Sequence, residues 1–407
     1  MPLRSLFVDF NSYFASVEQH LQPRLRGKPV AVVPVLADTT CCIAASYEAK
    51  RFGVKTGTRV GDAKKLCPGL KIIEARPSLY VEYHRKLVDM VESCMHVSRV
   101  LSIDEMDCEL TGRWQKREEA LALARQIKES ISKQIGPALR CSIGIAPNTF
   151  LAKTASDMQK PDGLVVIEEK DLPDCLYRLE LRDFCGIGEN MERRLREHGI
   201  CTVKDMCTAS RNALHAAWGS IEGERMYELL RGRVVPDRET EHRSVGHSHV
   251  LPPEERNNAD AFAVLNRLLQ KAAMRLRKME YLAGGLSLTV KYSGDKRWND
   301  EIHITETDDS LELLRLMKQL WEKRGRPSAA PIAVGVVLSR LVHRGNFTPS
   351  LFVKAAGRKN SLNKAVDSLN EKFGKNAVYF GGAHEALESA PLRIAFNRIP
   401  DLETEGD

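Results

Sequence analysis

The spacing of hydrophobic residues changes repeatedly along the chain, and this predicts an alternation of strands and helices. In the first 170 residues, short apolar runs typical of buried strands alternate with segments of helical periodicity. The apolar runs cover residues 3–9, 29–34, 100–103, 106–110, 141–146 and 164–167. The helical segments cover residues 12–21, 47–51, 60–66, 78–98 and 118–135. This order is typical of an α/β or α+β domain.

The second half of the chain has a different pattern. Residues from about 170 to 231 read as short helices with glycine turns, and residues 232–243 are polar and non-periodic, as in a linker. Strands are then predicted at 244–251, 285–293, 300–305 and 332–341, with helices at 258–280 and 309–323. These elements suit a two-layer α+β domain. One further helix is predicted at about 358–373.

Composition and charge narrow the classes of protein. At 407 residues, with 43% hydrophobic and 28% charged residues, the chain needs more than one core. It has no apolar run near the ~20 residues that span a bilayer, no signal peptide and no Cys-x-x-Cys pair, so we expect a cytoplasmic protein. The net charge is +7, and residues 241–350 hold 17 Lys and Arg against 13 Asp and Glu. A localised basic excess suits a polyanionic partner.

Acidic residues follow two of the apolar runs. Asp9 comes after Leu6-Phe7-Val8, and Asp104-Glu105 come after residues 100–103. Three carboxylates that converge at strand ends cannot all stay ionised without a partner, and Mg²⁺ prefers such oxygen ligands. Two ions roughly 3.5–4 Å apart would hold both the attacking and the leaving oxygens of a phosphoryl transfer. Alternatively, each acid only caps a turn.

Several ordered motifs surround these acids and resemble known proteins. The motifs are Phe10–Glu18, Ala45–Gly57, Ser102–Glu105, Cys141–Ala146 and Lys153–Gly163. Together they resemble the Y-family DNA polymerases, specifically the DNA polymerase IV branch. The resemblance covers about 160 residues closely and extends more loosely to about residue 341.

The resemblance implies a multidomain α+β fold shaped as a right hand. We expect a palm with an antiparallel sheet plus helices, small fingers, a helical thumb with a helix-hairpin-helix, and an α+β little finger. The expected boundaries are 1–16 and 73–168 for the palm, 17–72 for the fingers, 169–231 for the thumb, 232–243 for a linker, 244–341 for the little finger and 342–407 for a C-terminal extension.

The resemblance also implies the chemistry. Asp9, Asp104 and Glu105 match metal-binding carboxylates, and the carbonyl of Phe10 matches an additional ligand for two Mg²⁺ ions, with Mn²⁺ as a substitute. The expected reaction adds dNTPs to a primer 3′-hydroxyl on damaged templates. Modest fidelity is implied, and without an exonuclease domain no proofreading is expected.

Other positions match contacts to the nucleotide. Phe14 matches the steric gate that excludes a 2′-hydroxyl, although a buried helix anchor is the alternative. The matched substrate-binding residues are Tyr13, Tyr47, Lys50 and Lys160, and Tyr13 could instead be core. Many relatives have Arg at position 50 and Thr at position 44, where this chain has Lys50 and Ala44; lysine keeps the charge but loses the bidentate fork.

Two further sets match contacts to the base pair and to DNA. Position 43 is commonly small in relatives, so we expect the β-branched Ile43 to reduce tolerance of bulky adducts. The residues expected to roof the nascent base pair are Cys41, Ile43 and Gly57. The expected DNA contacts are Gly186 and Gly188 of a Gly-x-Gly turn, and Ser244, Gly246, His247, Ser248 and Arg340 of the little finger. Alone, a Gly-x-Gly is more often an ordinary helix-helix turn.

We expect a monomer that binds primer-template DNA and dNTPs. A sliding clamp stays an open partner, because the last ten residues match no clamp peptide and Ser350-Leu351-Phe352 is only a weak candidate. Two rival functions are a non-catalytic accessory protein and a nucleotide cyclase. The three acids argue against the first, and the helix-hairpin-helix and Phe14 argue against the second.

Overall fold

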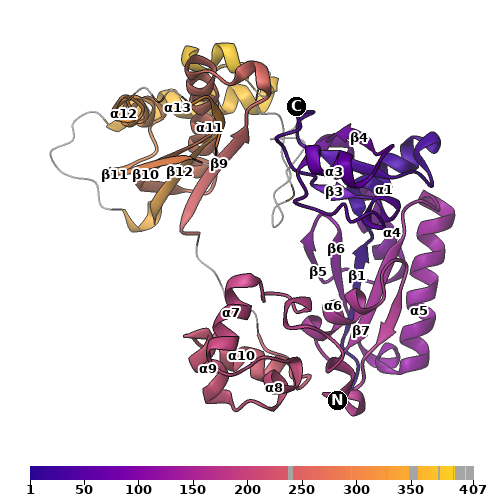
Figure 1. The fold of residues 1–407 in the computed structure, drawn as a ribbon. Helices are drawn as coiled ribbons and strands as arrows, with labels where there is room; N and C mark the ends of the chain where they lie inside the picture. The colour runs from indigo at the N-terminus through magenta and orange to yellow at the C-terminus, as the bar shows by residue number, and fades with distance from the viewer. Residues whose placement is uncertain are drawn as a thin grey trace. The chain divides into compact units, whose positions relative to one another are not determined.

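The computed structural model describes residues 1–236, 242–294, 296–325, 327, 329–347, 356–374, 376–387, 389 and 399 (Figure 1). The chain forms two compact units, the first built mainly from Met1–Val33 and Cys41–Arg238 and the second mainly from residues 239–393. Among the described helices, none is both long and apolar enough to cross a membrane.

A five-stranded sheet is the centre of the first unit. Its order is β5 (Arg99–Ser102), β6 (Glu105–Glu109), β1 (Ser5–Phe10), β7 (Cys141–Ala146) and β8 (Leu164–Val166). The pairs are antiparallel except for β8, which runs parallel to β7 at one edge. All six residues of β1 are buried, as a strand covered on both faces requires. The strand that carries Asp9 is therefore buried along its whole length between β6 and β7.

Helices pack against this sheet, and the ends of two of them differ from the sequence prediction. Helix α6 (Thr149–Met158) lies against β1 and β7, and α4 (Pro77–Cys94) packs on α5 (Arg117–Ser130). The sequence predicted α4 to run on to residue 98, but the chain is already extended at Met95. The predicted helix 118–135 ends instead in a π-helical turn, Ile131–Ile135.

A smaller sheet follows α1 (Tyr13–Leu21). It has the order β3 (Ala44–Ala45), β2 (Val30–Val33) and β4 (Lys71–Glu74), and the short helices α2 (Tyr47–Lys50) and α3 (Val60–Leu66) belong to the same region. The sequence missed β4, because its four residues are mostly exposed or half-buried and give no apolar run.

Four helices complete the first unit. They are α7 (Glu189–Glu197), α8 (Val203–Thr208), α9 (Arg211–Trp218) and α10 (Glu222–Leu229), and they share one core with α6. The amide of Asn148 donates to the carbonyls of Leu229 and Arg233, both at 2.9 Å, and so ties the start of α6 to the end of α10.

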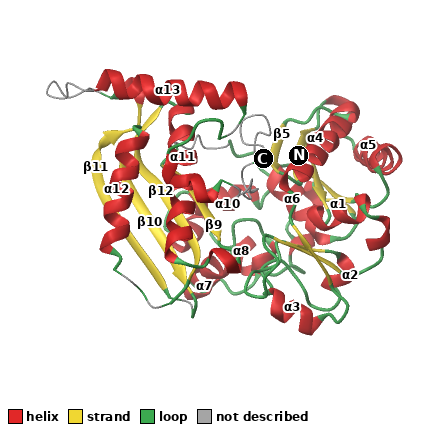
Figure 2. Cartoon of the chain, turned by 90° about the horizontal axis from the view of Figure 1, so that it is seen from above, coloured by secondary structure: helices red, strands yellow, loops and turns green. Residues whose placement is uncertain are grey.

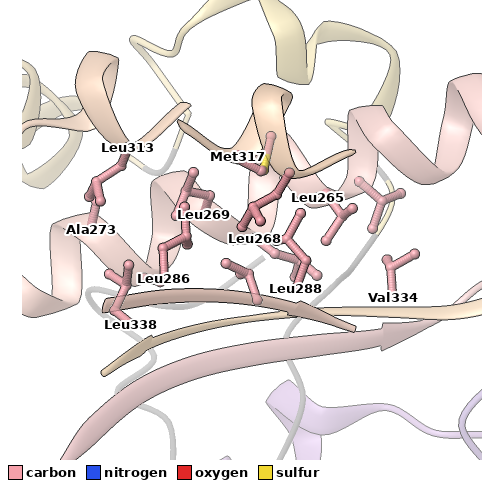
Figure 3. Close-up of a cluster of buried hydrophobic side chains, with 14 of the residues drawn as sticks. Leu265, Leu268, Leu269, Ala273, Leu286, Leu288, Leu313, Met317, Val334 and Leu338 are labelled. Carbon is pink, nitrogen blue, oxygen red and sulfur yellow. The ribbon is translucent and has the colours of Figure 1, made fainter. Parts of the chain in front are cut away.

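The second unit is a two-layer domain, as predicted. Its antiparallel sheet has the order β11 (Arg297–Thr307), β10 (Tyr281–Tyr292), β12 (Pro331–His343) and β9 (Ser244–Val250). Helices α11 (Asn258–Lys278) and α12 (Ser310–Lys323) cover one face (Figure 2). Leucines of α11 meet leucines of β10 and β12 in this core (Figure 3).

The segment after β12 returns to cover α11. Helix α13 (Ala356–Phe373) and the 3-10 turn η9 (Gly381–Ala386) belong to it. Arg277 of α11 makes two hydrogen bonds to the Asp367 carboxylate at 2.6 and 2.7 Å, and Arg267 donates to the Ala386 carbonyl at 2.6 Å. Among the basic residues of α11, Lys271 and Arg275 are partly exposed and Lys278 is exposed.

The Arg277–Asp367 pair gives a test of this cover. The side chain of Arg277 is 9% exposed, so Asp367→Ala leaves a buried guanidinium without its carboxylate. We expect a loss of about 2 kcal/mol in unfolding free energy, somewhat below the cost of breaking a fully buried pair. Chemical denaturation of the full chain measures it. Glu371→Ala, an exposed acid on the same helix, is the control; equal stability of the two variants would contradict the assignment.

Candidate active site

The predicted acids meet at one end of the five-stranded sheet. Asp9 lies near the end of β1, opposite Glu105 of β6 on one side and Ser142 of β7 on the other. Asp104 directly precedes β6, and its carbonyl accepts a hydrogen bond from the N–H of Phe10 at 2.9 Å. The antiparallel pairing of β1 with β6 thus brings Asp9 next to Glu105, although the two residues are far apart in the sequence.

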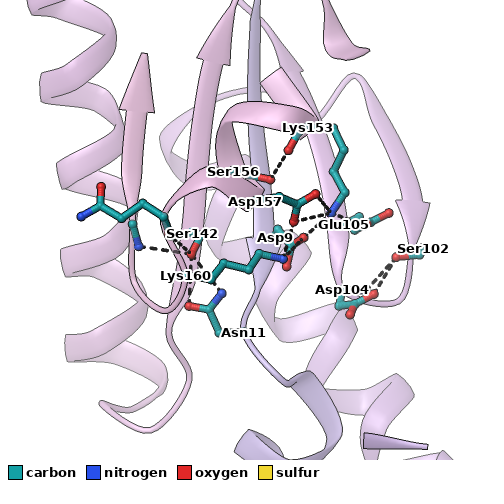
Figure 4. A network of polar contacts seen from close by, with 12 residues as sticks. Asp9, Asn11, Ser102, Asp104, Glu105, Ser142, Lys153, Ser156, Asp157 and Lys160 are labelled. Carbon is teal, nitrogen blue, oxygen red and sulfur yellow. Dashed lines mark hydrogen bonds and ion pairs between the residues drawn. The ribbon is translucent and has the colours of Figure 1, made fainter. Parts of the chain in front are cut away.

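Two lysines balance the charge of these acids (Figure 4). The Nζ of Lys153 lies 2.5 Å from Asp9, 2.8 Å from Glu105 and 3.2 Å from Asp157. The Nζ of Lys160 lies 2.7 Å from both Asp9 and Asp157. Burial lowers the pKa of the Lys153 ammonium, but the carboxylates outweigh burial and raise the pKa above its ordinary value. Both lysines therefore stay charged at neutral pH.

Asp104 has a different environment from Asp9. The hydroxyl of Ser102 donates to its carboxylate at 2.6 Å. Burial raises the pKa of Asp104 to about 6, against the lowering effect of Ser102 and with the help of the negative charges of Asp9 and Glu105. This carboxylate therefore holds its proton more readily than an ordinary aspartate.

The acids do not form a ready-made metal site. In the described parts of the chain, no group of three or more His, Cys, Asp or Glu is arranged to hold a metal ion. The reason is that Lys153 lies between Asp9 and Glu105, and Asp104 is hydrogen-bonded to Ser102. The donor chemistry still fits a hard divalent cation, because carboxylate oxygens of neighbouring strands already share one cationic group.

The predicted gate residue lies at the start of α1. The ring of Phe14 is partly exposed and stacks on Tyr80, with centroids 4.6 Å apart and planes at 21°. Tyr80 is fully buried, and its hydroxyl donates to Glu18 at 2.8 Å. The ring of Phe14 is therefore supported from behind, as a gate requires, and is not the buried anchor of the alternative interpretation.

Tyr13 fits the core alternative given for it in the sequence analysis. Its side chain is only 3% exposed, and its hydroxyl donates to the carbonyl of Tyr80 at 2.6 Å. Because both the ring and the hydroxyl are used in packing, only the backbone of Tyr13 remains for a substrate contact.

The predicted phosphate contacts come together near Asp9. The Nζ of Lys50 lies 4.4 Å from the centre of the Tyr47 ring, one helical turn away on α2. Desolvation lowers the pKa of Lys50, and the neighbouring charge of Lys160 lowers it further, while Asp9 opposes both. The ammonium groups of Lys50 and Lys160 thus sense each other's charge, and with the Tyr47 ring they lie beside the acids.

The predicted roof residues also lie together. Cys41 and Arg59 form a β-bridge, and the N–H of Gly57 donates to the carbonyl of Cys42 at 2.8 Å. The hydroxyl of Thr56 reaches the carbonyl of Ile43 at 3.4 Å. Gly57 has φ +89°, a conformation that favours glycine. The three predicted positions therefore lie on two adjacent segments.

The Gly-x-Gly turn opens α7. Phe184 and Ile187 are buried on either side of Gly186, which has φ +88°. Gly188 precedes the first turn of α7, and both glycines are exposed with open space where a Cβ would lie. Exposed amides at a helix start suit phosphate oxygens.

In the second unit, the residues predicted to contact DNA lie on both faces of the sheet. Ser244, Gly246 and Ser248 are exposed on alternate positions of β9, on the side away from the helices. His247 is half-buried and points to the opposite side, so strand alternation argues against its grouping with the serines. Arg340 is exposed on β12 with φ +53°, and it lies 3.1 Å from the Nε2 of His303.

Sequence reasoning missed two charged residues of the site. Lys153 and Asp157 stand in a motif that the sequence analysis quoted, but they received no role. Their spacing of four residues on α6 puts them on one helix face, with Lys160 three residues beyond Asp157. This helical spacing of opposite charges is the sequence signal that could have identified them.

The fold and site together define a polymerase of the right-hand class, and comparisons with known proteins specify it. The impB/mucB/samB family matches residues 8–157, its C-terminal domain matches residues 242–351, and the thumb domain of DNA polymerase-iota matches residues 182–233. DNA polymerase IV of Moorella thermoacetica is 31% identical over 92% of this chain and 94% of its own length. DNA polymerase IV 1 of Halalkalibacterium halodurans is 33% identical over 92% of each.

Solved structures agree on the fold. A Y-family DNA polymerase chimera matches with a TM-score of 0.69 and 24% identity, over 84% of this chain and 99% of the other. An insertion ternary complex of Dbh DNA polymerase matches with a TM-score of 0.55 and 25% identity over the same shares. The chain therefore belongs to the Y-family of DNA polymerases, in the DNA polymerase IV branch, and is a DNA-directed DNA polymerase. The predicted α+β right-hand fold class is confirmed.

The stacked gate gives a direct test. Phe14→Ala removes the ring that lies on Tyr80 and would lie under the sugar, so we expect ribonucleotide incorporation to rise by at least about tenfold. Single-nucleotide insertion with dNTP and rNTP measures the ratio. Phe52→Ala, which removes an exposed ring elsewhere, is the control. An unchanged ratio in Phe14→Ala would retire the gate assignment.

The roof gives a second test. Ile43 is β-branched and partly exposed beside Gly57, so Ile43→Ala should enlarge the space above the nascent pair. We expect better bypass of a bulky minor-groove guanine adduct, with extension on undamaged DNA nearly unchanged. Running-start extension on matched templates compares the two. Equal bypass by both proteins would contradict the role of Ile43.

Proposed function

We propose that this chain is a translesion polymerase that transfers the nucleotidyl group of a dNTP to a primer 3′-hydroxyl with two Mg²⁺ ions and without proofreading. The observation that carries the proposal is the convergence of Asp9, Asp104 and Glu105 beside Tyr47 and the ammonium groups of Lys50 and Lys160. Acids suit hard cations, and the neighbouring cationic groups suit a triphosphate.

The residues that would hold the ions are the three carboxylates and, as a prediction from the family, the Phe10 carbonyl. When bound, the ions neutralise the triphosphate and favour the ionised primer hydroxyl. The protein's own residues do the rest. Lys160 and Lys50 attract the phosphate oxygens, Tyr47 orients them, and the ring of Phe14 blocks a 2′-hydroxyl. Catalysis is then mainly positioning and electrostatic stabilisation.

We further propose that duplex DNA is held through its backbone. The exposed turn at Gly186 and Gly188 and the open face of β9 offer amides and small hydroxyls, which fit phosphates without reading sequence. The similarity to an insertion ternary complex of Dbh DNA polymerase supports a site that takes DNA and nucleotide together. We expect the affinity of the protein for primer-template DNA to fall steeply as the salt concentration rises.

The domain boundaries given from the sequence are part of the proposal. Separate sheets at β1 and β2 and the helical group α7–α10 support a palm, fingers and thumb. The change of compact unit near residue 238 supports a linker at 232–243. We propose that the enzyme acts as a monomer, since the acids, gate and phosphate contacts come from one chain. A clamp contact is not proposed, because residues 350–352 lie outside the described residues.

Primer extension with Mg²⁺ and dNTPs tests the function. The unmodified chain should extend a primer across a lesion and show no 3′-exonuclease activity. A protein that binds DNA but does not extend it would favour the accessory reading, and a cyclic nucleotide product would favour the cyclase.

Glu105→Ala tests the chemistry at its centre. Glu105 is opposite Asp9 in the sheet, so its loss should lower extension by about 10³-fold, comparable to removing a key electrostatic group. DNA affinity should change little, and calorimetric Mn²⁺ binding should weaken. Glu109→Ala, an exposed acid at the other end of β6, is the control. Extension that survives in Glu105→Ala would refute its catalytic role.

A further inference from the structure

Lys128 lies on α5 and is not among the residues that contact Asp9 or Glu105. It contacts the segment that carries Lys160. Its Nζ donates to the carbonyls of Cys141 and Asp162 at 2.8 Å and of Gly163 at 3.2 Å. It also lies 2.6 Å from the carboxylate of Asp162, and its side chain is 20% exposed. An ammonium has three protons, and here every one has an acceptor.

The contacted segment, residues 159–163, connects α6 to β8 through a tight turn. Asp162 has φ +60°, which is uncommon for a residue with a side chain. A Cβ on Gly163 would lie 1.8 Å from the carbonyl oxygen of Gln159, so this position requires glycine. The turn therefore has one backbone arrangement that the surrounding residues must maintain.

Two side chains besides Lys128 hold this backbone (Figure 4). The amide oxygen of Asn11 accepts from the N–H of Asp162 at 2.7 Å. The hydroxyl of Ser142 accepts from the N–H of Gly163 at 3.1 Å and is 3.2 Å from the Gln159 carbonyl. Asn11 and Ser142 thus satisfy N–H groups, while Lys128 is the residue among these three that satisfies several carbonyls at once.

The carbonyls explain why a lysine stands at position 128. Carbonyl oxygens that converge on one point repel each other unless a donor lies between them. A compact ammonium directs three protons from a single atom, whereas the planar fork of arginine does not. Without this donor, the carbonyls would separate and the turn would shift.

A shift of this turn would reach the site. Lys160 lies between the α6 end and the Asp162 turn, and its Nζ is 2.7 Å from Asp9 and from Asp157. Catalysis is sensitive to displacements of about 1 Å in groups that position a substrate. Lys128 itself contacts the carbonyls of the turn, the carbonyl of Cys141 on β7 and the carboxylate of Asp162, and it does not contact Lys160 or Asp9 in any of these bonds.

We propose that Lys128 is a positioning residue that fixes Lys160 for contact with the triphosphate of the incoming nucleotide. The inference rests on the proposed role of Lys160 in binding that triphosphate. Lys128 touches no reacting atom; it acts through the backbone of residues 159–163.

Lys128→Met tests this, because methionine keeps an unbranched side chain and removes the protons. We expect the KM for dNTP to rise about tenfold, with kcat and the Kd for primer-template DNA within about twofold. Lys133→Met is the matched control, since Lys133 is exposed and pairs with Glu129 one turn away. A KM equal to that of the control would overturn the proposal.

Two further measurements separate positioning from a general loss of structure. In a Lys160→Ala background, Lys128→Met should change KM little, because the residue that it positions is gone; full additivity would overturn the proposal. Amide hydrogen exchange of the free protein should become faster at Asp162 and Gly163 and stay unchanged in the core of β1. Unchanged exchange at the turn would refute the contact's importance.

The two proposals fail in different ways. If the unmodified chain does not extend primers, the proposed function is wrong and the positioning role is wrong with it. If the chain extends normally while Lys128→Met keeps its KM, only the inference about Lys128 is wrong.

Discussion

The charge balance around Asp9 is the constraint on which the site depends. Asp9 is 5% exposed, and a buried carboxylate is costly unless it is paired. Lys153 and Lys160 supply the pairing, and both come from α6 or the segment after it. The position of α6 against β1 and β7 is therefore needed both for the fold and for the electrostatics of the site.

The proposed gate residue, Phe14, shows a similar dependence on the folded core. Phe14 stacks on Tyr80, and Tyr80 is fixed by Glu18, which is fully buried. Arg76 also donates to Glu18 at 3.0 Å, so the charge of this acid is matched. The 2′-hydroxyl of a ribonucleotide would have to displace the Phe14 ring. The ring would resist this displacement, because the groups behind it are part of the core of the domain.

How much the sequence could predict depends on whether the signal is local. The acids at 9 and 104–105 were predictable, because each follows an apolar run and the family motif identifies it. Most strands and helices were predictable for the same reason. The pairing of Lys153 with Asp9 was not, since it depends on how α6 packs against β1. The burial of Tyr13 was open between two interpretations, and the contact of α13 with α11 was not predictable, because Arg277 and Asp367 are distant in sequence.

The surroundings of Lys50 partly compensate for the absence of the arginine that many relatives are expected to have at this position. Arginine would offer a bidentate fork to phosphate, and lysine offers a single point of charge. Here the ammonium of Lys50 lies over the Tyr47 ring, which favours a cation and limits the freedom of the long side chain. Lys160 stands close enough to lower the pKa of Lys50. Two neighbouring ammonium groups repel each other until an anion lies between them. The proposed triphosphate would relieve this repulsion, so Lys50 keeps the positive charge that an arginine would provide at this position, although it loses the fork's fixed direction.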